Sequence, residues 1–393
     1  MICVGIDVAK NKHDCYIANS EGEVLASVFT IENNLEGFRS LFTRIRSVAP
    51  DLKKVKVGLE ATGHYSYNLL GFLLDKGLAT YVINPLHTNL FRKSLSLRKT
   101  KTDRVDARTI VAMMLSGVVF ESYTDTSYHN EDLKSLTRYR FDKVRERAQL
   151  KQSVSRLVTI LFPELEHLVS SLHMTSVYAL LSEAPGARQV ASMHLTHLTN
   201  LIETSSKGRY RKDKAIEIKE AAKASIGSAM PAKSLELSHT IRLIEELTKE
   251  IDEVEKVIKD MMDEINSPIL SIPGLGYRMG AMIIAEIGDF SHFATPDKLL
   301  AYAGLSPTTY QSGQLDGAYA HMEKRGSRYL RYALINSTKF VCKWDSTFAA
   351  YLAKKRAEGK HYNVAISHAA KKLVRLIFAM QRSGLPYKYP TYL

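Results

Sequence analysis

The N-terminal third of the chain alternates between short apolar runs and helical patterns, and this order constrains the fold more than any other feature. Residues 2–7 are apolar and β-prone, and residues 13–19 and 23–30 have the pattern of two further strands. Because a short turn joins the last two, we expect an antiparallel meander. Apolar residues then recur at helical spacing over residues 35–45, which predicts a helix.

The same alternation continues to about residue 115. A strand is predicted at 55–60, a helix at 67–74, a strand at 80–83, and a last helix from about 102 through Met114. The order βββαβαβα is that of the ribonuclease H-like fold, a mixed sheet with helices on both faces. We therefore predict an α/β domain over residues 1–125.

Two helical regions are expected after this domain. Residues 126–265 contain long, charged helical segments, and a heptad seam predicts a coiled coil there, formed either with the helix near 150–161 or with another subunit. Residues 266–393 are predicted to form a helical C-terminal domain. The seam residues are Ile244, Leu247, Ile251, Val254, Ile258 and Met261.

The C-terminal region opens on Gly274-Leu275-Gly276 between two short predicted helices, which indicates a helix-hairpin-helix element. Glycines allow the tight turn, and backbone N–H groups at a helix start can hold a DNA phosphate. Residues 307–326 are expected to be a loop, and basic helices follow.

Charge and cysteine content narrow the function further. The chain has 54 Lys+Arg against 41 Asp+Glu, a formal net charge of +13, which favours a polyanionic partner such as nucleic acid. Three cysteines without CxxC spacing exclude a disulfide framework and a cysteine zinc site, and they indicate a reducing compartment. The start of the sequence lacks signal-peptide features and no apolar stretch reaches the ~20 residues of a membrane span, so we expect a soluble, cytoplasmic protein.

Four carboxylates are candidates for a metal site. Asp7 and Glu60 each end an apolar strand, where ligands of α/β sheets bind, and Asp103 and Asp106 share one face of a predicted helix. Each also has a simpler interpretation, as a solvated strand-end acid or as a first-turn acid that complements the helix dipole. Taken together they favour Mg²⁺ or Mn²⁺ and phosphoryl transfer. Histidines are scattered without ligand spacing, which argues against zinc.

Ser312 lies in the loop after the hairpin element and is a candidate nucleophile. Ser-Gly is also a common turn pair, and no base at a fixed spacing marks this serine as activated. The basic residues that follow are either stabilisers of a phosphate transition state or solvated helix charges: Lys324, Arg325, Arg328 and Arg331.

Seven motifs, taken in order, resemble the DEDD transposases, the insertion sequence one-ten family that also contains the pilin-gene invertase. Any one of them is weak, but the ordered set is specific and spans residues 2–385. The motifs are GIDVAK (5–10), EATG (60–63), KTDRVDA (101–107), PGLG (273–276), AGLSP (303–307), QSG (311–313) and KRGSRYLR (324–331).

The resemblance implies a RuvC-like domain whose acidic tetrad falls on Asp7, Glu60, Asp103 and Asp106, and a transposase domain whose serine falls on Ser312. It implies a DNA recombinase that joins element ends and target, guided in several members by a non-coding bridge RNA. In the family picture the serine attacks a DNA phosphate and forms a covalent link, beside the Mg²⁺-binding carboxylates of another subunit. A homo-oligomer, dimer or tetramer, is therefore expected.

Three other functions remain open from the sequence. An RNase H-like, junction-resolving nuclease would use metal-activated water and leave Ser312 as a turn residue. A DNA invertase would act without RNA. A non-catalytic nucleic-acid-binding protein would use only the basic surface, with binding that weakens steeply as salt rises.

Overall fold

The computed structural model forms two compact units. One contains Met1–Asp132 with Gly288–Ala294, and the other contains Leu133–Ile287 with Thr295–Leu393. The three-domain division at 1–125, 126–265 and 266–393 stays a prediction. The structure describes residues 1–60, 63–83, 85–95, 103–116, 125–307, 311–312, 315–316 and 322–389.

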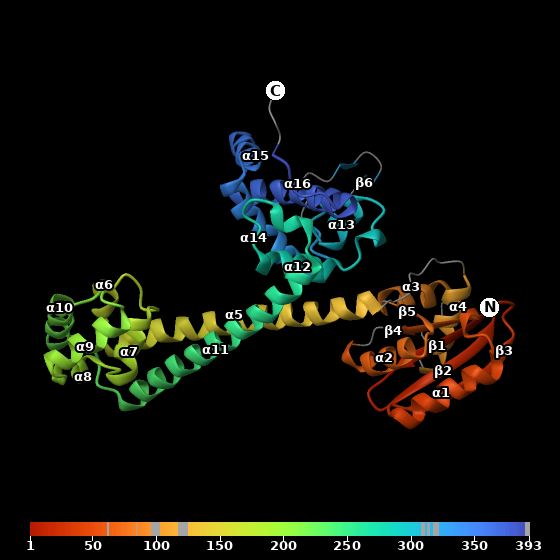
Figure 1. Cartoon of the computed structure of the whole chain (residues 1–393), viewed down its shortest axis with the longest axis horizontal. Helices are drawn as coiled ribbons and strands as arrows, with labels where there is room; N and C mark the ends of the chain where they lie inside the picture. Colours follow the sequence, from red (N-terminus) through yellow and green to blue (C-terminus); the bar gives the residue numbers. More distant parts are fainter. Residues whose placement is uncertain are drawn as a thin grey trace. The chain divides into compact units, whose positions relative to one another are not determined.

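The first unit is built on a five-stranded mixed sheet, as the sequence predicts (Figure 1). The strand order is β3-β2-β1-β4-β5, in which β2 is antiparallel to both neighbours while β1, β4 and β5 are mutually parallel. This arrangement fits the expected ribonuclease H-like domain. The strands are β1 (Ile2–Val8), β2 (Lys12–Asn19), β3 (Val24–Glu32), β4 (Val55–Glu60) and β5 (Ala79–Ile83).

Helices cover both faces of this sheet. The face formed by Val4, Ile6 and Val8 packs in one core with α1 (Leu35–Val48) and α2 (Tyr67–Asp75). The opposite face, which includes Cys3 and Ala18, packs against α4 (Asp103–Leu115). Alternation along β1 therefore assigns each residue to one of two helical layers.

Helix α3 (Pro85–Leu95) was not expected from the sequence pattern. Asn84-Pro85 indicates the end of a strand, but proline is equally favoured at the first position of a helix. Leu86, Leu90 and Phe91 stand at helical spacing in the sequence, but Asn84-Pro85 was interpreted only as the end of a strand. The helix packs against α4 and carries Arg92.

Two glycines let α4 lie directly on the sheet. Gly5 and Gly58 are register partners on the neighbouring parallel strands β1 and β4. A Cβ at Gly5 would lie 2.3 Å from the carbonyl oxygen of Ala107, and a Cβ at Gly58 would lie 2.8 Å from Ile110 Cγ2. Because real Cβ atoms do not come this close, only glycine at these positions allows α4 to pack at its observed depth.

The second unit contains most of α5 (Asp125–Leu161) and all of α11 (Pro231–Ile265), which lie side by side and antiparallel. Lys143 Nζ lies 3.4 Å from Glu250 Oε2. Further along the two helices, Arg156 Nη2 lies 3.5 Å from Glu236 Oε1. Among the seam residues, Ile244, Leu247, Ile251 and Ile258 are buried. The partner helix that the sequence left open is thus α5 of the same chain, while a coiled-coil supercoil stays a prediction.

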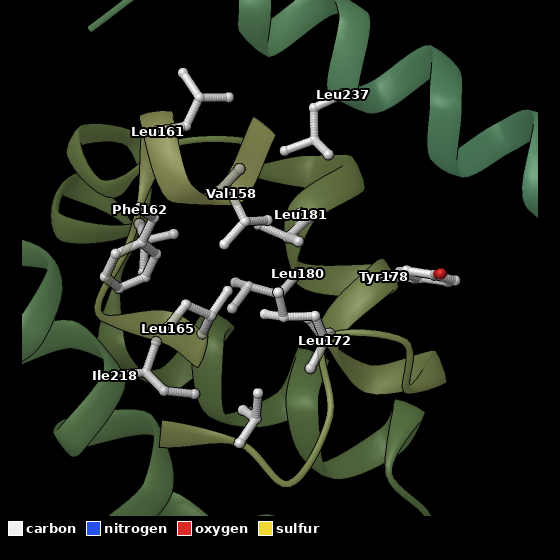
Figure 2. Packing of buried hydrophobic residues seen from close by; sticks show 14 of the residues in the cluster. Val158, Leu161, Phe162, Leu165, Leu172, Tyr178, Leu180, Leu181, Ile218 and Leu237 are labelled. Carbon is white, nitrogen blue, oxygen red and sulfur yellow. The ribbon is translucent and has the colours of Figure 1, made fainter. Parts of the chain in front are cut away.

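A small helical module links the ends of α5 and α11, and its core is shown in Figure 2. Leu165, Leu180 and Val158 point toward one another, and the Tyr178 hydroxyl at the edge hydrogen-bonds His173 Nδ1 at 3.0 Å. The module consists of α6 (Leu165–Leu168), α7 (Thr175–Glu183), α8 (Ala187–Ser192), α9 (Leu195–Ser205) and α10 (Lys212–Lys223).

The C-terminal helices pack mainly on α14 (Arg328–Trp344). Gly274 has φ +87°, and a Cβ there would lie 2.7 Å from the carbonyl of Phe340, so the predicted hairpin packs backbone to backbone on α14. A short 3₁₀ turn (Pro268–Ser271) precedes that hairpin, and the helix-hairpin-helix assignment stays a prediction. The other elements are α12 (Tyr277–Ile287), a 3₁₀ turn (Phe290–His292), α13 (Pro296–Tyr302), β6 (Gln311–Ser312), β7 (Leu315–Asp316), α15 (Ser346–Ala357) and α16 (Tyr362–Ser383).

Over the described ranges, no helix combines the length and apolar character that crossing a membrane requires.

Candidate functional site

Asp7 and Glu60 end two neighbouring parallel strands. The last register pair between β1 and β4 is Ile6 with Leu59, so Asp7 and Glu60 are the next residue on each strand. Because side chains alternate, both acids point to the same face as Gly5 and Gly58, the face covered by α4. Both are half-buried. The structure thus brings these two sequence-predicted residues together.

Helix α4 runs antiparallel to β1. Cys3 packs against Val111, and Gly5 lies against Ala107 and Val111, so advancing along the strand means going back along the helix. Two strand residues rise ~6.6 Å and one helical turn rises ~5.4 Å, so the start of α4 lies level with Asp7. Asp103 is the first residue of α4. Its side chain lies outside the described residues.

Asp106 is buried and is held by an arginine from α3. Arg92 Nη1 lies 2.9 Å from Asp106 Oδ1, and Arg92 Nη2 donates to Asn89 Oδ1 at 2.9 Å. The Asp106 side chain is 7% exposed and the Arg92 side chain 24%. The sequence offered no sign of this ion pair, because the pairing depends on how α3 packs on α4.

Asp14 is a further carboxylate on this face that the sequence analysis did not single out. It lies opposite Asp7 in the antiparallel β1–β2 register, so the two side chains share a face. Asp14 is buried and accepts a hydrogen bond from Thr30 Oγ1 at 2.5 Å. Its neighbour His13 points to the opposite face and stacks on Phe38, and burial lowers the His13 pKa. His13 is therefore a core residue.

The carboxylates at this end of the sheet are chemically suited to bind a hard divalent cation, because such ions prefer oxygen ligands. Asp7, Glu60 and the start of α4 converge there from three elements. Within the described side chains, no three His, Cys, Asp or Glu residues are close enough together to hold a metal ion, and Asp103 is outside that set.

Ser312 lies in a short hairpin. Gln311 pairs with Asp316 and Ser312 with Leu315, so the strands β6 and β7 are joined by residues 313–314. Ser312 is therefore the last paired residue of β6. Its side chain lies outside the described residues.

The segments on either side of this hairpin are tied together by main-chain hydrogen bonds. Pro307 and Met322 form an antiparallel bridge, Glu323 N donates to Ser306 O at 3.0 Å, and Ser327 N donates to Tyr302 O at 3.3 Å. We call these main-chain contacts between residues 302–307 and 322–327 the ladder. Gly326 packs tightly at one end of it, because a Cβ there would lie 2.0 Å from the Tyr302 carbonyl oxygen. The chain segments 302–307 and 322–327, which precede and follow the hairpin, are thus held together between α13 and α14.

Glu286 links the start of α14 to α5. Its buried carboxylate receives two hydrogen bonds from Arg138, at 2.5 Å from Nε and 2.9 Å from Nη2. It also accepts a hydrogen bond from Ser327 Oγ at 2.5 Å, while Ser327 Oγ caps α14 by accepting from Leu330 N at 3.1 Å. Ser327 therefore has a structural role at the start of α14. Sequence patterns do not reveal this cluster because Glu286 and Arg138 lie far apart in the chain.

The basic residues after the hairpin have different partners. Arg331 Nη1 donates to the carbonyl oxygens of Ala303 and Lys324, which makes it part of the ladder. Arg328 lies over the Tyr329 ring and donates to its hydroxyl at 2.7 Å. The Arg325 side chain is 88% exposed and is the strongest candidate in this set for a phosphate contact.

A second buried glutamate, Glu255 of α11, attaches α12. Arg140 Nε lies 2.7 Å from Oε1 and Arg278 Nη2 lies 2.6 Å from Oε2. Burial by itself raises the Glu255 pKa, but the hydrogen bonds and charges of Arg278 and Arg140 outweigh it and leave the pKa below its ordinary value of 4.5. The ion pairs therefore persist at mildly acidic pH.

This lowered pKa predicts how stability depends on pH. A depressed carboxyl pKa contributes stability that is present above pH 4.5 and is lost as the pH falls through the lower folded value. Glu255→Gln is expected to lower the free energy of unfolding by about 2 kcal/mol at pH 7. Urea unfolding at a series of pH values should show this difference shrinking below pH 4.5. Glu246→Gln, an exposed acid on the same helix, is the control, and a difference that did not change with pH would contradict the assignment.

Comparison with known proteins gives two family matches. Residues 4–163 match the DEDD transposase model of IS110, and residues 266–353 match a transposase model described as the IS116/IS110/IS902 family. The two matched segments contain the sheet carboxylates and the serine hairpin respectively.

Whole-length relatives and a solved structure were also found. The chain is 26% identical to the 44.8 kDa protein of insertion element IS116 from Streptomyces clavuligerus, over 97% of this chain and 94% of that protein. It is 24% identical to a pilin gene-inverting protein from Moraxella bovis, over 98% and 97%. T. thermophilus RuvC, solved in complex with a Holliday junction substrate, matches 31% of this chain and 99% of its own at 13% identity, with a TM-score of 0.23.

Proposed function

The chain belongs to the IS116/IS110/IS902 family of DNA transposases, and from this we propose that it cleaves and rejoins DNA site-specifically, with carboxylate-bound Mg²⁺, a serine nucleophile and a bridge RNA as guide. It is an enzyme of phosphoryl transfer on DNA. The observation that carries the proposal is the paired placement of Asp7 and Glu60 at the strand ends, level with the start of α4.

In this proposal Asp7, Glu60, Asp103 and Asp106 hold the metal, with Mn²⁺ as an alternative to Mg²⁺. A bound divalent ion would neutralise charge on the scissile phosphate and on the displaced oxygen. The two acids of the sheet fix one side of the site, because their strands are hydrogen-bonded in register. Helix α4 supplies the other side, and its N-terminal dipole adds positive potential where phosphate would lie.

Ser312 is the proposed nucleophile. Its hydroxyl oxygen would bond to phosphorus as the bond from phosphorus to a deoxyribose oxygen breaks. The serine proton passes to solvent, and the departing oxygen takes up a proton. One phosphodiester replaces another, so the reverse step can rejoin DNA without an energy source. The main-chain ladder at 302–307 and 322–327 supports this role, because it holds together the segments that precede and follow the hairpin.

A homo-oligomer, dimer or tetramer, is also proposed. Large apolar side chains remain exposed along α11, with Leu235 at 59%, Leu243 at 55% and Val257 at 47% exposure. Burying such side chains against a second copy would be favourable.

The net charge of +13 and the family resemblance support an RNA guide. The test is to express the chain with its native flanking DNA and to sequence the nucleic acid that co-purifies. A discrete, structured RNA transcribed from the flank is the expected result. Heterogeneous cellular RNA alone would instead favour a DNA invertase that acts without an RNA guide. The Moraxella bovis relative is named as a pilin gene-inverting protein.

A further inference from the structure

Arg92 is a basic group that the structure places directly on a proposed metal ligand, Asp106. The guanidinium donates to Asp106 Oδ1 at 2.9 Å and is oriented by Asn89, three residues earlier on the same helix. The carboxylate is nearly buried, so solvent screens the pair little. Such a charge-assisted hydrogen bond fixes both the position and the charge balance of Asp106.

We propose that Arg92 is a positioning residue that competes with the divalent metal for Asp106, and that it passes to a DNA phosphate when the metal is bound. This inference rests on the proposed metal site. It adds a link between metal binding and DNA binding that the carboxylates alone would not provide.

The geometry gives the reason for competition. A magnesium ion binds a carboxylate oxygen at ~2.1 Å. With Arg92 Nη1 2.9 Å from the same oxygen, a +2 and a +1 charge would be at most about 5 Å apart. Their repulsion in a partly buried site is large, so metal bound to Oδ1 weakens the contact with Arg92. By reciprocity, removing the Arg92 charge must strengthen metal binding.

A phosphate is the natural second acceptor for this arginine. The planar guanidinium fork matches phosphate oxygens, and the phosphate charge would offset the repulsion between Arg92 and the metal. DNA should therefore tighten metal binding to the wild-type chain more than to a chain without the Arg92 charge.

The test measures Mn²⁺ binding to the full chain by electron paramagnetic resonance, without and then with duplex DNA. Arg92→Gln is expected to lower the Mn²⁺ Kd by at least about tenfold without DNA. It should also reduce the further tightening that DNA produces. Arg92→Met keeps the apolar stem and should behave alike, so a folding defect in one variant does not decide the outcome. Circular dichroism checks each fold.

Arg108→Gln is the matched control. It removes the same charge from α4 two residues after Asp106, where Arg108 lies over the Tyr16 ring. Its Mn²⁺ affinity should stay close to that of the wild type. The proposed competition is refuted if Arg92→Gln and Arg92→Met bind Mn²⁺ no more tightly than the wild type. It is also refuted if their Mn²⁺ Kd values equal that of Arg108→Gln.

Asp106→Asn separates this inference from the proposed function. Loss of Mn²⁺ binding in Asp106→Asn with unchanged binding in Arg92→Gln would refute only the role of Arg92. Equal Mn²⁺ binding in wild type and Asp106→Asn would remove Asp106 from the proposed site and refute the inference. No Mn²⁺ binding in any variant or in the wild type would refute the metal site itself.

Discussion

Asp7→Asn is expected to lower the recombination rate by at least about 1,000-fold while leaving the fold intact. The substitution keeps the shape of the side chain and removes one charge from the carboxylates at the end of the sheet. Each metal ligand supports several kcal/mol of transition-state stabilisation, which corresponds to this loss of rate. Because Asp7 is half-buried at a strand end, the surrounding core does not depend on its charge.

The measurement is joining of a donor plasmid carrying the element to a plasmid carrying its target, scored by sequencing the junctions. Asp75→Asn is the control, an exposed acid of the same unit at the end of α2, and it should recombine normally. Normal recombination by Asp7→Asn with a native circular dichroism spectrum would remove Asp7 from the proposed metal site.

Ser312→Ala is expected to eliminate the covalent protein–DNA adduct. The alanine lacks the oxygen that would bond to phosphorus, so no denaturation-resistant link can form at this residue. Labelled element-end DNA incubated with protein and Mg²⁺, then run on a denaturing gel, should show a shifted band with wild type and none with the variant. An RNase H-like nuclease would give cleaved DNA without any adduct in either protein.

Ser327→Ala is the matched control for this experiment. It removes a hydroxyl from the same motif-bearing region, but that hydroxyl caps α14 and donates to Glu286. Its loss should lower stability by about 1 kcal/mol and leave the adduct in place. If Ser312→Ala forms the adduct in unchanged yield, another residue must be the nucleophile. If Ser327→Ala keeps its fold but forms no adduct, Ser327 would be that nucleophile.

Local pattern predicted most of the first unit. Each of the five strands coincides with an apolar or alternating run, and α1, α2 and α4 follow apolar residues at helical spacing. Helix α3 was missed because Asn84-Pro85 was interpreted as the end of a strand and not as the start of a helix. The heptad pattern located the buried face of α11, but periodicity is the same for a partner in the same chain as for one in another.

The placement of two candidate acids was predictable from the sequence, while the contacts around them were not. Asp7 and Glu60 were identifiable as acids at the ends of strands, and the register brings them together. Asp14 escaped notice because its relation to Asp7 depends on strand register. The partnerships of Arg92 with Asp106 and of Arg138 with Glu286 are tertiary pairings, which no local spacing rule encodes.

The glycine pair in β1 and β4 has a consequence for how the acids of sheet and helix are spaced. At Gly5 the main chain of the strand contacts the main chain of α4. The distance between the sheet and this helix is therefore set there by main-chain atoms, with no side chain between them. Side chains can repack and change length during evolution, but this main-chain contact distance cannot. The gap that a metal ion and a phosphate would have to fit is therefore set by covalent dimensions common to all proteins. The strand ends and the helix start can then vary in sequence around the acids while the reach of those acids toward one another stays constant.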